Sequence, residues 1–187
     1  MTRILAISGS LRERSYNRAL LRAAGELAPE GVEIEEFDIS SLPFYDGDVE
    51  AAGDPEPVAA LRAAVAEADG ILIATPEYNR GTSGVLKNAI DWLSRPALAS
   101  VLRWKPVAIM GASTGRGGTR RAQQQVRDAL LFPGAIVLED PEVALPVAWE
   151  HFDEDGRLMD EKTRDSIRAL LEGLVAAPRA QQRVEAA

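Results

Sequence analysis

The sequence contains no cysteine and a single histidine, His151, and only 5% of its residues are aromatic. Without cysteine there is no disulfide, no thiol nucleophile, no iron–sulfur cluster and none of the usual zinc sites. A single histidine also excludes metal sites built from several imidazoles, so we expect no metal.

Long apolar runs are missing as well. The run after Arg3 covers only residues 4–7, and the longest one, residues 143–149, is interrupted by Pro146. A signal peptide needs an apolar core of roughly 7–15 residues, and a membrane-spanning helix needs ~20. We therefore expect neither, and we predict a cytoplasmic protein.

Basic residues are outnumbered, since 21 Lys and Arg against 29 Asp and Glu give a net charge of −8. Binding to phosphate backbones requires clustered Lys and Arg, so we expect neither a nucleic-acid partner nor an anionic membrane surface. A chain of 187 residues suggests one domain. We place that domain at residues 1–178 and predict a flexible tail over residues 179–187, where few large apolar side chains remain.

Short aliphatic runs alternate with segments of helical period. Strands are predicted over residues 3–8, 32–37, 70–75, 107–112 and 135–139. Helical stripes fall at residues 16–27, 58–68 (after Asp54 and Pro55, a cap and first turn), 86–93, 122–130 and 167–175, the last ended by Pro178. Three strands are continuous apolar runs, which is typical of parallel strands buried on both faces. The alternation predicts a doubly wound α/β sheet.

In such sheets ligands bind beyond the carboxyl ends of the strands. The loop after the first strand, residues 8–17, leads directly into a helix and offers Ser10, Ser15 and Asn17 as donors. A helix start adds backbone N–H groups and a positive dipole, which together suit a phosphate. The arginines at positions 12, 14 and 18 add charge, although Ser15 could instead simply cap the helix. The loop is neither a Walker loop nor a Gly-x-Gly-x-x-Gly fingerprint.

The next two loops at this edge also carry unusual residues. Residues 75–84 combine a proline, an aromatic, an amide and two glycines, which suits the edge of a planar heteroaromatic ligand. The alternative for this segment is an ordinary turn with Ser83 as a helix cap. Residues 112–118 are glycine-rich and could close over a ligand.

Three motifs together resemble the NADPH-dependent FMN reductase family, flavodoxin-like flavoproteins that include quinone and chromate reductases. They are Gly9-Ser10-Leu11-Arg12-x-x-Ser15-Tyr16-Asn17, Pro76-Glu77-Tyr78-Asn79, and Gly84-x-Leu86-Lys87-Asn88-Ala89-Ile90-Asp91-Trp92-Leu93-Ser94. The resemblance covers about residues 3–145. It implies a flavodoxin-like five-stranded parallel sheet in the order 2-1-3-4-5 with helices on both faces, and a homodimer or homotetramer.

The resemblance also implies which residues hold the cofactor. The FMN phosphate and ribityl chain would be held by Ser10, Arg12, Ser15, Tyr16 and Asn17. The isoalloxazine ring would be lined by Pro76, Glu77, Tyr78 and Asn79, and Ser113 would touch its far edge. NADPH or NADH would reduce the flavin, and quinones, azo compounds, free flavin or metal oxyanions would leave with the electrons in a ping-pong exchange. Because the flavin carries this chemistry, we expect no catalytic side chain.

Several alternatives remain open at this point. A flavodoxin-like electron carrier that docks on a redox partner would share the fold, as would a flavin-free nucleotide-binding or interaction module. Selectivity for NADPH over NADH needs a placed arginine, for which Arg80, Arg116 and Arg120 are the candidates. Residues 92–102 and 141–152 carry aromatics that we expect to bury against a second subunit.

Overall fold

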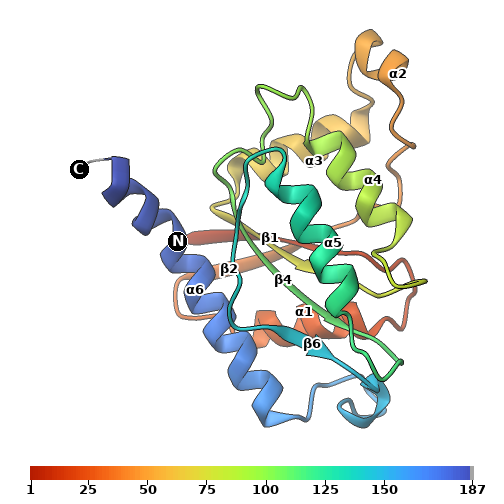
Figure 1. Cartoon of the computed structure of the whole chain (residues 1–187). Coiled ribbons are helices and arrows are strands. Elements are labelled where there is room, and N and C mark those ends of the chain that lie inside the picture. The colour runs from red at the N-terminus through yellow and green to blue at the C-terminus, as the bar shows by residue number, and fades with distance from the viewer. Residues whose placement is uncertain (186–187) are drawn as a thin grey trace.

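The chain folds around one parallel sheet, shown in Figure 1. The computed structural model describes residues 1–185, with the side chains of residues 1–177. The strands are β1 (Thr2–Ser8), β2 (Val32–Phe37), β3 (Gly70–Ala74), β4 (Pro106–Ala112), β5 (Ile136–Val137) and β6 (Val143–Leu145). Their order is β2-β1-β3-β4-β5, with β6 also paired to β4. The predicted strand order is therefore confirmed.

The predicted count of five strands is wrong, because the sheet has six. β5 pairs with the beginning of β4, at Pro106 and Val107, whereas β6 pairs with its end, at residues 110–112. The two short strands therefore lie one after the other along the same edge of β4. The chain between them contains Pro141, which has no N–H to donate to a strand pairing.

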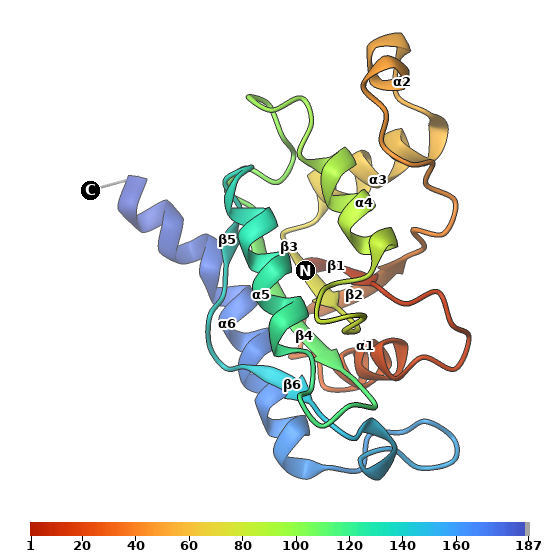
Figure 2. The ribbon, with the colours of Figure 1, turned by 45° about the vertical axis from the view of Figure 1, so that its right-hand side comes forward.

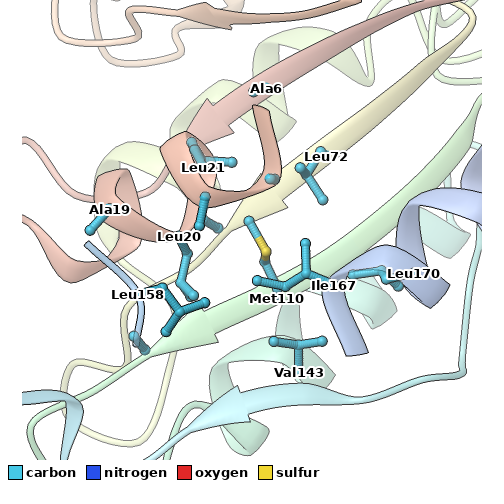
Figure 3. Packing of buried hydrophobic residues seen from close by; sticks show 14 of the residues in the cluster. Ala6, Ala19, Leu20, Leu21, Leu72, Met110, Val143, Leu158, Ile167 and Leu170 are labelled. Carbon is cyan, nitrogen blue, oxygen red and sulfur yellow. The ribbon is translucent and has the colours of Figure 1, made fainter. Parts of the chain in front are cut away.

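Two apolar layers cover the two faces of the sheet. Successive residues of one strand face opposite sides, so Ile4 joins the layer under α1 (Tyr16–Glu26) and α6 (Glu161–Glu185), whereas Leu5 joins the other. Figure 3 shows side chains of the first layer from α1, β3, β4 and α6 gathered together. The second layer lies under α3 (Glu56–Glu67), α4 (Gly84–Leu93) and α5 (Arg120–Leu131). The continuous apolar runs are thus strands buried on both faces, as predicted.

The helices depart from the prediction in three places. A further helix, α2 (Gly47–Ala52), has no buried residue and hence no apolar stripe to predict it from. At α3 the N-cap position is taken by Pro55, while the carboxylate of Asp54 instead pairs with Arg62. α6 continues past Pro178 to Glu185, because good helix formers flank that proline on both sides.

The expected end of that helix is therefore wrong, and residues 186–187 of the predicted tail lie outside the described residues. The remaining short helix is η1 (Ala148–Glu150), one turn of 3₁₀ helix. Within residues 1–185, no helix has the length and apolarity to cross a membrane.

Candidate functional site

The loops after β1, β3 and β4 leave the sheet on the same side, the right-hand side of Figure 1, and Figure 2 shows them from a second angle. They enclose a small cleft of about 130 Å³. Its lining residues are Ser10, Arg12, Ser15, Tyr16, Asn17, Pro76, Glu77, Tyr78, Ala112, Ser113 and Thr114. All of the predicted site residues except Asn79 therefore line one cleft, together with Ala112 and Thr114 of the predicted third loop.

The first loop presents a helix start to the cleft. Ser15 is the N-cap of α1, and its hydroxyl oxygen accepts from the Asn17 N–H at 3.2 Å. The capping alternative is therefore correct for Ser15, and it is compatible with an anion there because the hydroxyl still has its own proton to donate. Ser10 is only 3% exposed, and among the described residues its hydroxyl has no hydrogen-bond partner. It is a donor available to a ligand.

The three arginines in and beside this loop do not all lie at the cleft. Arg12 and Arg14 are exposed, and Arg12 lines the cleft. Arg18 instead forms an ion pair with Glu36 of β2, at 3.1 Å. Of the three arginines expected to act together, Arg12 is the one that lines the cleft, since Arg14 is not among the lining residues.

The Asn17 side chain is bonded to the main chain of another loop. Its Nδ2 donates to the carbonyl of Ala112 at 3.0 Å, and its Oδ1 accepts from the Ala112 N–H at 2.9 Å. Because Ala112 is the last residue of β4, this pair of hydrogen bonds fixes the start of α1 against the beginning of the third loop. Asn17 thus shapes the cleft by holding two of its walls together.

The second loop contains a tight turn at its tip. Tyr78 and Gly81 exchange backbone hydrogen bonds of 2.9 and 3.0 Å. Between them Asn79 and Arg80 have φ of 51° and 66°, the left-handed pair of a type I′ turn. Asn79 is exposed and outside the cleft lining, so the structure does not place it with the other predicted residues.

Ser83 connects the second loop to the first. Its hydroxyl donates to the Gly9 carbonyl at 2.6 Å and accepts from the Leu86 N–H at 3.3 Å, as the N-cap of α4. The capping interpretation of Ser83 is confirmed. Space is tight at this contact, because a Cβ on Gly9 would lie 2.9 Å from Pro76 Cδ.

Glu77 and Gln125 attach the second loop to α5. The Glu77 carboxylate accepts from the N–H groups of Arg121 (3.1 Å) and Ala122 (3.3 Å). Gln125 Oε1 accepts from the Thr82 N–H at 2.7 Å. No sequence pattern points to Gln125, since its role depends only on where α5 packs.

The third loop is held at its first residue. The Ser113 N–H donates to Leu145, and the Ser113 carbonyl accepts from Ala148, both at 3.0 Å. Beside these bonds Val147 has φ of 45°, which is unfavourable for a β-branched residue. Strained residues are often found at functional sites. The segment around Val147 thus forms the outer support of the third loop.

Comparison with known proteins places this chain in a family. The sequence profile of the NADPH-dependent FMN reductase family matches residues 2–150. The chain belongs to that family. It is 49% identical over 172 residues to an NAD(P)H-dependent FMN reductase of Pseudomonas aeruginosa, covering 92% of each chain. It is 38% identical over 174 residues to a 2-hydroxy-1,4-benzoquinone reductase of a Burkholderia species, covering 93% of this chain and 94% of the relative.

A solved structure agrees with the sequence relatives. FerB, a flavoenzyme NAD(P)H:acceptor oxidoreductase of Paracoccus denitrificans, has a TM-score of 0.84 and 34% identity, over 94% of this chain and 96% of that one. The three motifs of the FMN reductase family lie at or beside the cleft: the first two in its lining loops, and the third on α4 behind the second loop. Membership of a reductase family does not favour the electron-carrier alternative.

Proposed function

We propose that the protein is an FMN-dependent NAD(P)H oxidoreductase that passes electrons to quinones. The observation that carries this proposal is the cleft itself. It combines the N-terminus of α1 with the loops after β3 and β4, at the edge where doubly wound sheets bind ligands. Family membership and the names of the relatives support the same reaction.

The residues present fit FMN. A phosphate suits the α1 start, where the Ser10 hydroxyl, the N-cap Ser15 and the exposed Arg12 line the cleft. The ring suits the opposite part of the cleft, between residues 76–78 and residues 112–114. Tyr16, Asn17, Glu77, Tyr78 and Ser113 then contribute walls and backbone rather than catalytic groups. Bound FMN would accept a hydride from NADPH or NADH and return two electrons to the acceptor.

Acceptor and assembly belong to the same proposal. In a ping-pong cycle the reductant leaves before the acceptor enters. Quinones, azo compounds, free flavin and metal oxyanions therefore bind at the same open face of the flavin as NADPH or NADH.

A cleft of about 130 Å³ is smaller than the ~300–1,000 Å³ of ligand pockets, so one chain leaves the ring partly uncovered. We propose that a second copy covers it, in a homodimer or homotetramer. Trp92, the aromatic of residues 92–102, is buried within the chain and cannot make that contact, whereas Leu98 and Trp149 are exposed and available for it. We place the protein in the cytoplasm, where NAD(P)H is available.

The test begins with the absorbance spectrum of the purified protein, with and without added FMN. The FMN-loaded protein is then mixed with NADPH or NADH and 1,4-benzoquinone. We expect catalytic oxidation of the reductant without any partner protein. A colourless chain that binds no added FMN contradicts the proposal and favours a flavin-free module. Flavin that is reduced but not reoxidised by quinone favours an electron carrier.

A variant links this activity to the cleft. Ser10→Ala removes an unpartnered hydroxyl, so we expect FMN to bind about tenfold more weakly, the loss of one hydrogen bond to a charged group. Stability should not change, since none of the described residues forms a hydrogen bond with this hydroxyl. Ser166→Ala is the matched control, because its hydroxyl bonds the Lys162 carbonyl on α6, away from the cleft. Equal FMN affinity in the two variants would remove Ser10 from the site.

A further inference from the structure

One carboxylate of the cleft is bonded to the start of a helix. Glu77 lies in the second loop, 44 residues before Arg121, and its Oε2 accepts from the N–H groups of both Arg121 and Ala122. Its side chain is only 12% exposed, and its Oε1 lies 4.0 Å from Arg121 Nη1. A largely buried carboxylate with two backbone donors is fixed in position.

α5 has no comparable group of its own. Its N-cap residue, Thr119, makes no side-chain cap, because the Thr119 hydroxyl accepts from Gln123 Nε2 at 2.9 Å instead. The first turn contains no acidic residue. The partial positive charge at this helix start is therefore met by Glu77, which comes from a different loop.

The same loop is attached to α5 a second time. Gln125, one turn further along the helix, accepts from the Thr82 N–H at 2.7 Å. The two attachments lie on either side of the turn formed by Tyr78 and Gly81. Because α5 directly follows the third loop, the two attachments fix the position of the second loop relative to the third. These two loops are the walls proposed to enclose the ring.

We propose that Glu77 is a positioning residue whose carboxylate joins the second loop to α5 and occupies the anion site at that helix start. The carboxylate thereby neutralises the positive end of the α5 dipole, which then does not stabilise the reduced cofactor. This inference rests on the proposed function. Uptake of a hydride adds two electrons and one proton to FMN, and therefore one negative charge to the ring, while NAD(P)H becomes NAD(P)⁺. A helix start neutralised by Glu77 stabilises that charge less than an uncompensated one, which favours passing the electrons on.

The two roles separate in two variants. Glu77→Gln keeps an oxygen that accepts from the helix amides and removes the charge, whereas Glu77→Ala removes both. Dissociation constants are measured for oxidised FMN and, without oxygen, for dithionite-reduced FMN. For Glu77→Gln we expect the preference for reduced over oxidised FMN to rise about tenfold, a midpoint potential about 30 mV higher for a two-electron couple.

Glu142→Gln is the matched control. The Glu142 carboxylate lies at the same helix start but pairs with the Arg120 side chain, at 2.7 Å, and both side chains are well exposed. Its removal changes the net charge equally, and solvent screening should keep its effect on the ratio below about twofold. A purely structural role of Glu77 would alter both affinities together. The proposal that Glu77 neutralises the α5 dipole is overturned if the ratio of the two FMN affinities is unchanged in Glu77→Gln. It is also overturned if Glu142→Gln shifts that ratio equally.

A measurement without cofactor tests the attachment itself. Hydrogen exchange of the Arg121 and Ala122 amides is followed by NMR in the cofactor-free chain. We expect both to exchange at least about tenfold faster in Glu77→Ala, with the amides of β1 unchanged. Unchanged exchange overturns the positioning role. If the parent chain binds no FMN, the proposed function fails, and this exchange result still decides whether Glu77 joins the loop to α5.

Discussion

Asn17 offers a strong test of how the cleft is built. Its amide makes two hydrogen bonds to the backbone of Ala112, at 2.9 and 3.0 Å, and both residues are 3% exposed. Asn17→Ala removes both bonds and leaves a buried N–H and a buried carbonyl unpaired. Each lost bond costs about 1 kcal/mol, and each unpaired group costs about 1–3 kcal/mol. Water entering from the cleft lowers the cost of each unpaired group, so we expect a loss of about 2–4 kcal/mol in the free energy of unfolding.

The structure supplies a matched control for this loss. Asn88 on α4 makes the same kind of pair, accepting from the Tyr45 N–H and donating to the Pro43 carbonyl, both at 2.8 Å. Those partners lie outside the cleft lining. Asn88→Ala should lower the free energy of unfolding by about 1–3 kcal/mol, because the Tyr45 N–H loses its partner whereas the Pro43 carbonyl still accepts from Trp92 Nε1 at 2.8 Å. It should not move the first and third loops relative to one another.

Two assays separate stability from binding. Urea unfolding followed by circular dichroism gives the free energy of unfolding of each variant. Titration with FMN under native conditions gives the affinity. We expect Asn17→Ala to bind FMN at least about tenfold more weakly than Asn88→Ala, a difference of about 1.4 kcal/mol. Equal FMN affinities for the two variants, each titrated under conditions in which it is folded, would refute the role of Asn17 in positioning the cleft.

Two further predictions concern stability away from the cofactor contacts. Arg80 has φ of 66° in a type I′ turn, where glycine is preferred after Asn79. Arg80→Gly should therefore raise the free energy of unfolding by about 0.5–1 kcal/mol in a urea titration. A decrease would contradict the view that Arg80 is strained in this turn. The hydrogen bond from the Thr163 hydroxyl, the largest cause, lowers the pKa of Asp160. A carboxyl whose pKa is lower in the folded state adds stability that is present above the unfolded pKa of about 3.9 and is lost as the pH falls further. The stability difference between the parent and Asp160→Asn should therefore shrink below about pH 4, and a constant difference from pH 7 to pH 3 would exclude this linkage.

Much of the fold could be predicted because apolar runs report burial directly. Residues 4–7 and 71–74 have no polar residue to face solvent, and both lie inside the sheet. β6 was missed because three residues, Val143–Leu145, carry too little pattern, and their partner is the end of β4 that β5 leaves unpaired. α2 was missed because it buries no residue, and its contacts are polar ones: the Asp46 cap and the hydrogen bonds of Glu50 with Tyr45 and Arg95. Local pattern therefore predicts elements that bury an apolar face over several residues, and misses those that are very short or held by polar contacts.

The site could be predicted as a set of loops but not as a set of side-chain roles. The sequence places Asn17 and Glu77 at the correct edge, because strand ends and helix starts fix where they lie. Their hydrogen-bond partners are far along the chain, 95 residues away for Asn17 and 44 for Glu77. Whether an amide or a carboxylate meets a ligand or a neighbouring backbone group depends on how α1 and α5 pack. That information is absent from the motifs themselves.

The polar side chains around the cleft fall into two physical groups with different consequences. Asn17, Ser83 and Glu77 each bond the backbone of a segment other than their own, so the three loops are cross-linked before any ligand arrives. The entropy of ordering these loops is then lost during folding rather than during binding, which strengthens the binding of a rigid ring. Substitution of such a residue lowers stability and affinity together. The Ser10 hydroxyl, unpartnered within the described residues, contributes nothing to that framework, and its loss should show in FMN affinity alone. Comparing the two kinds of variant therefore distinguishes residues that build the cleft from residues that bind in it.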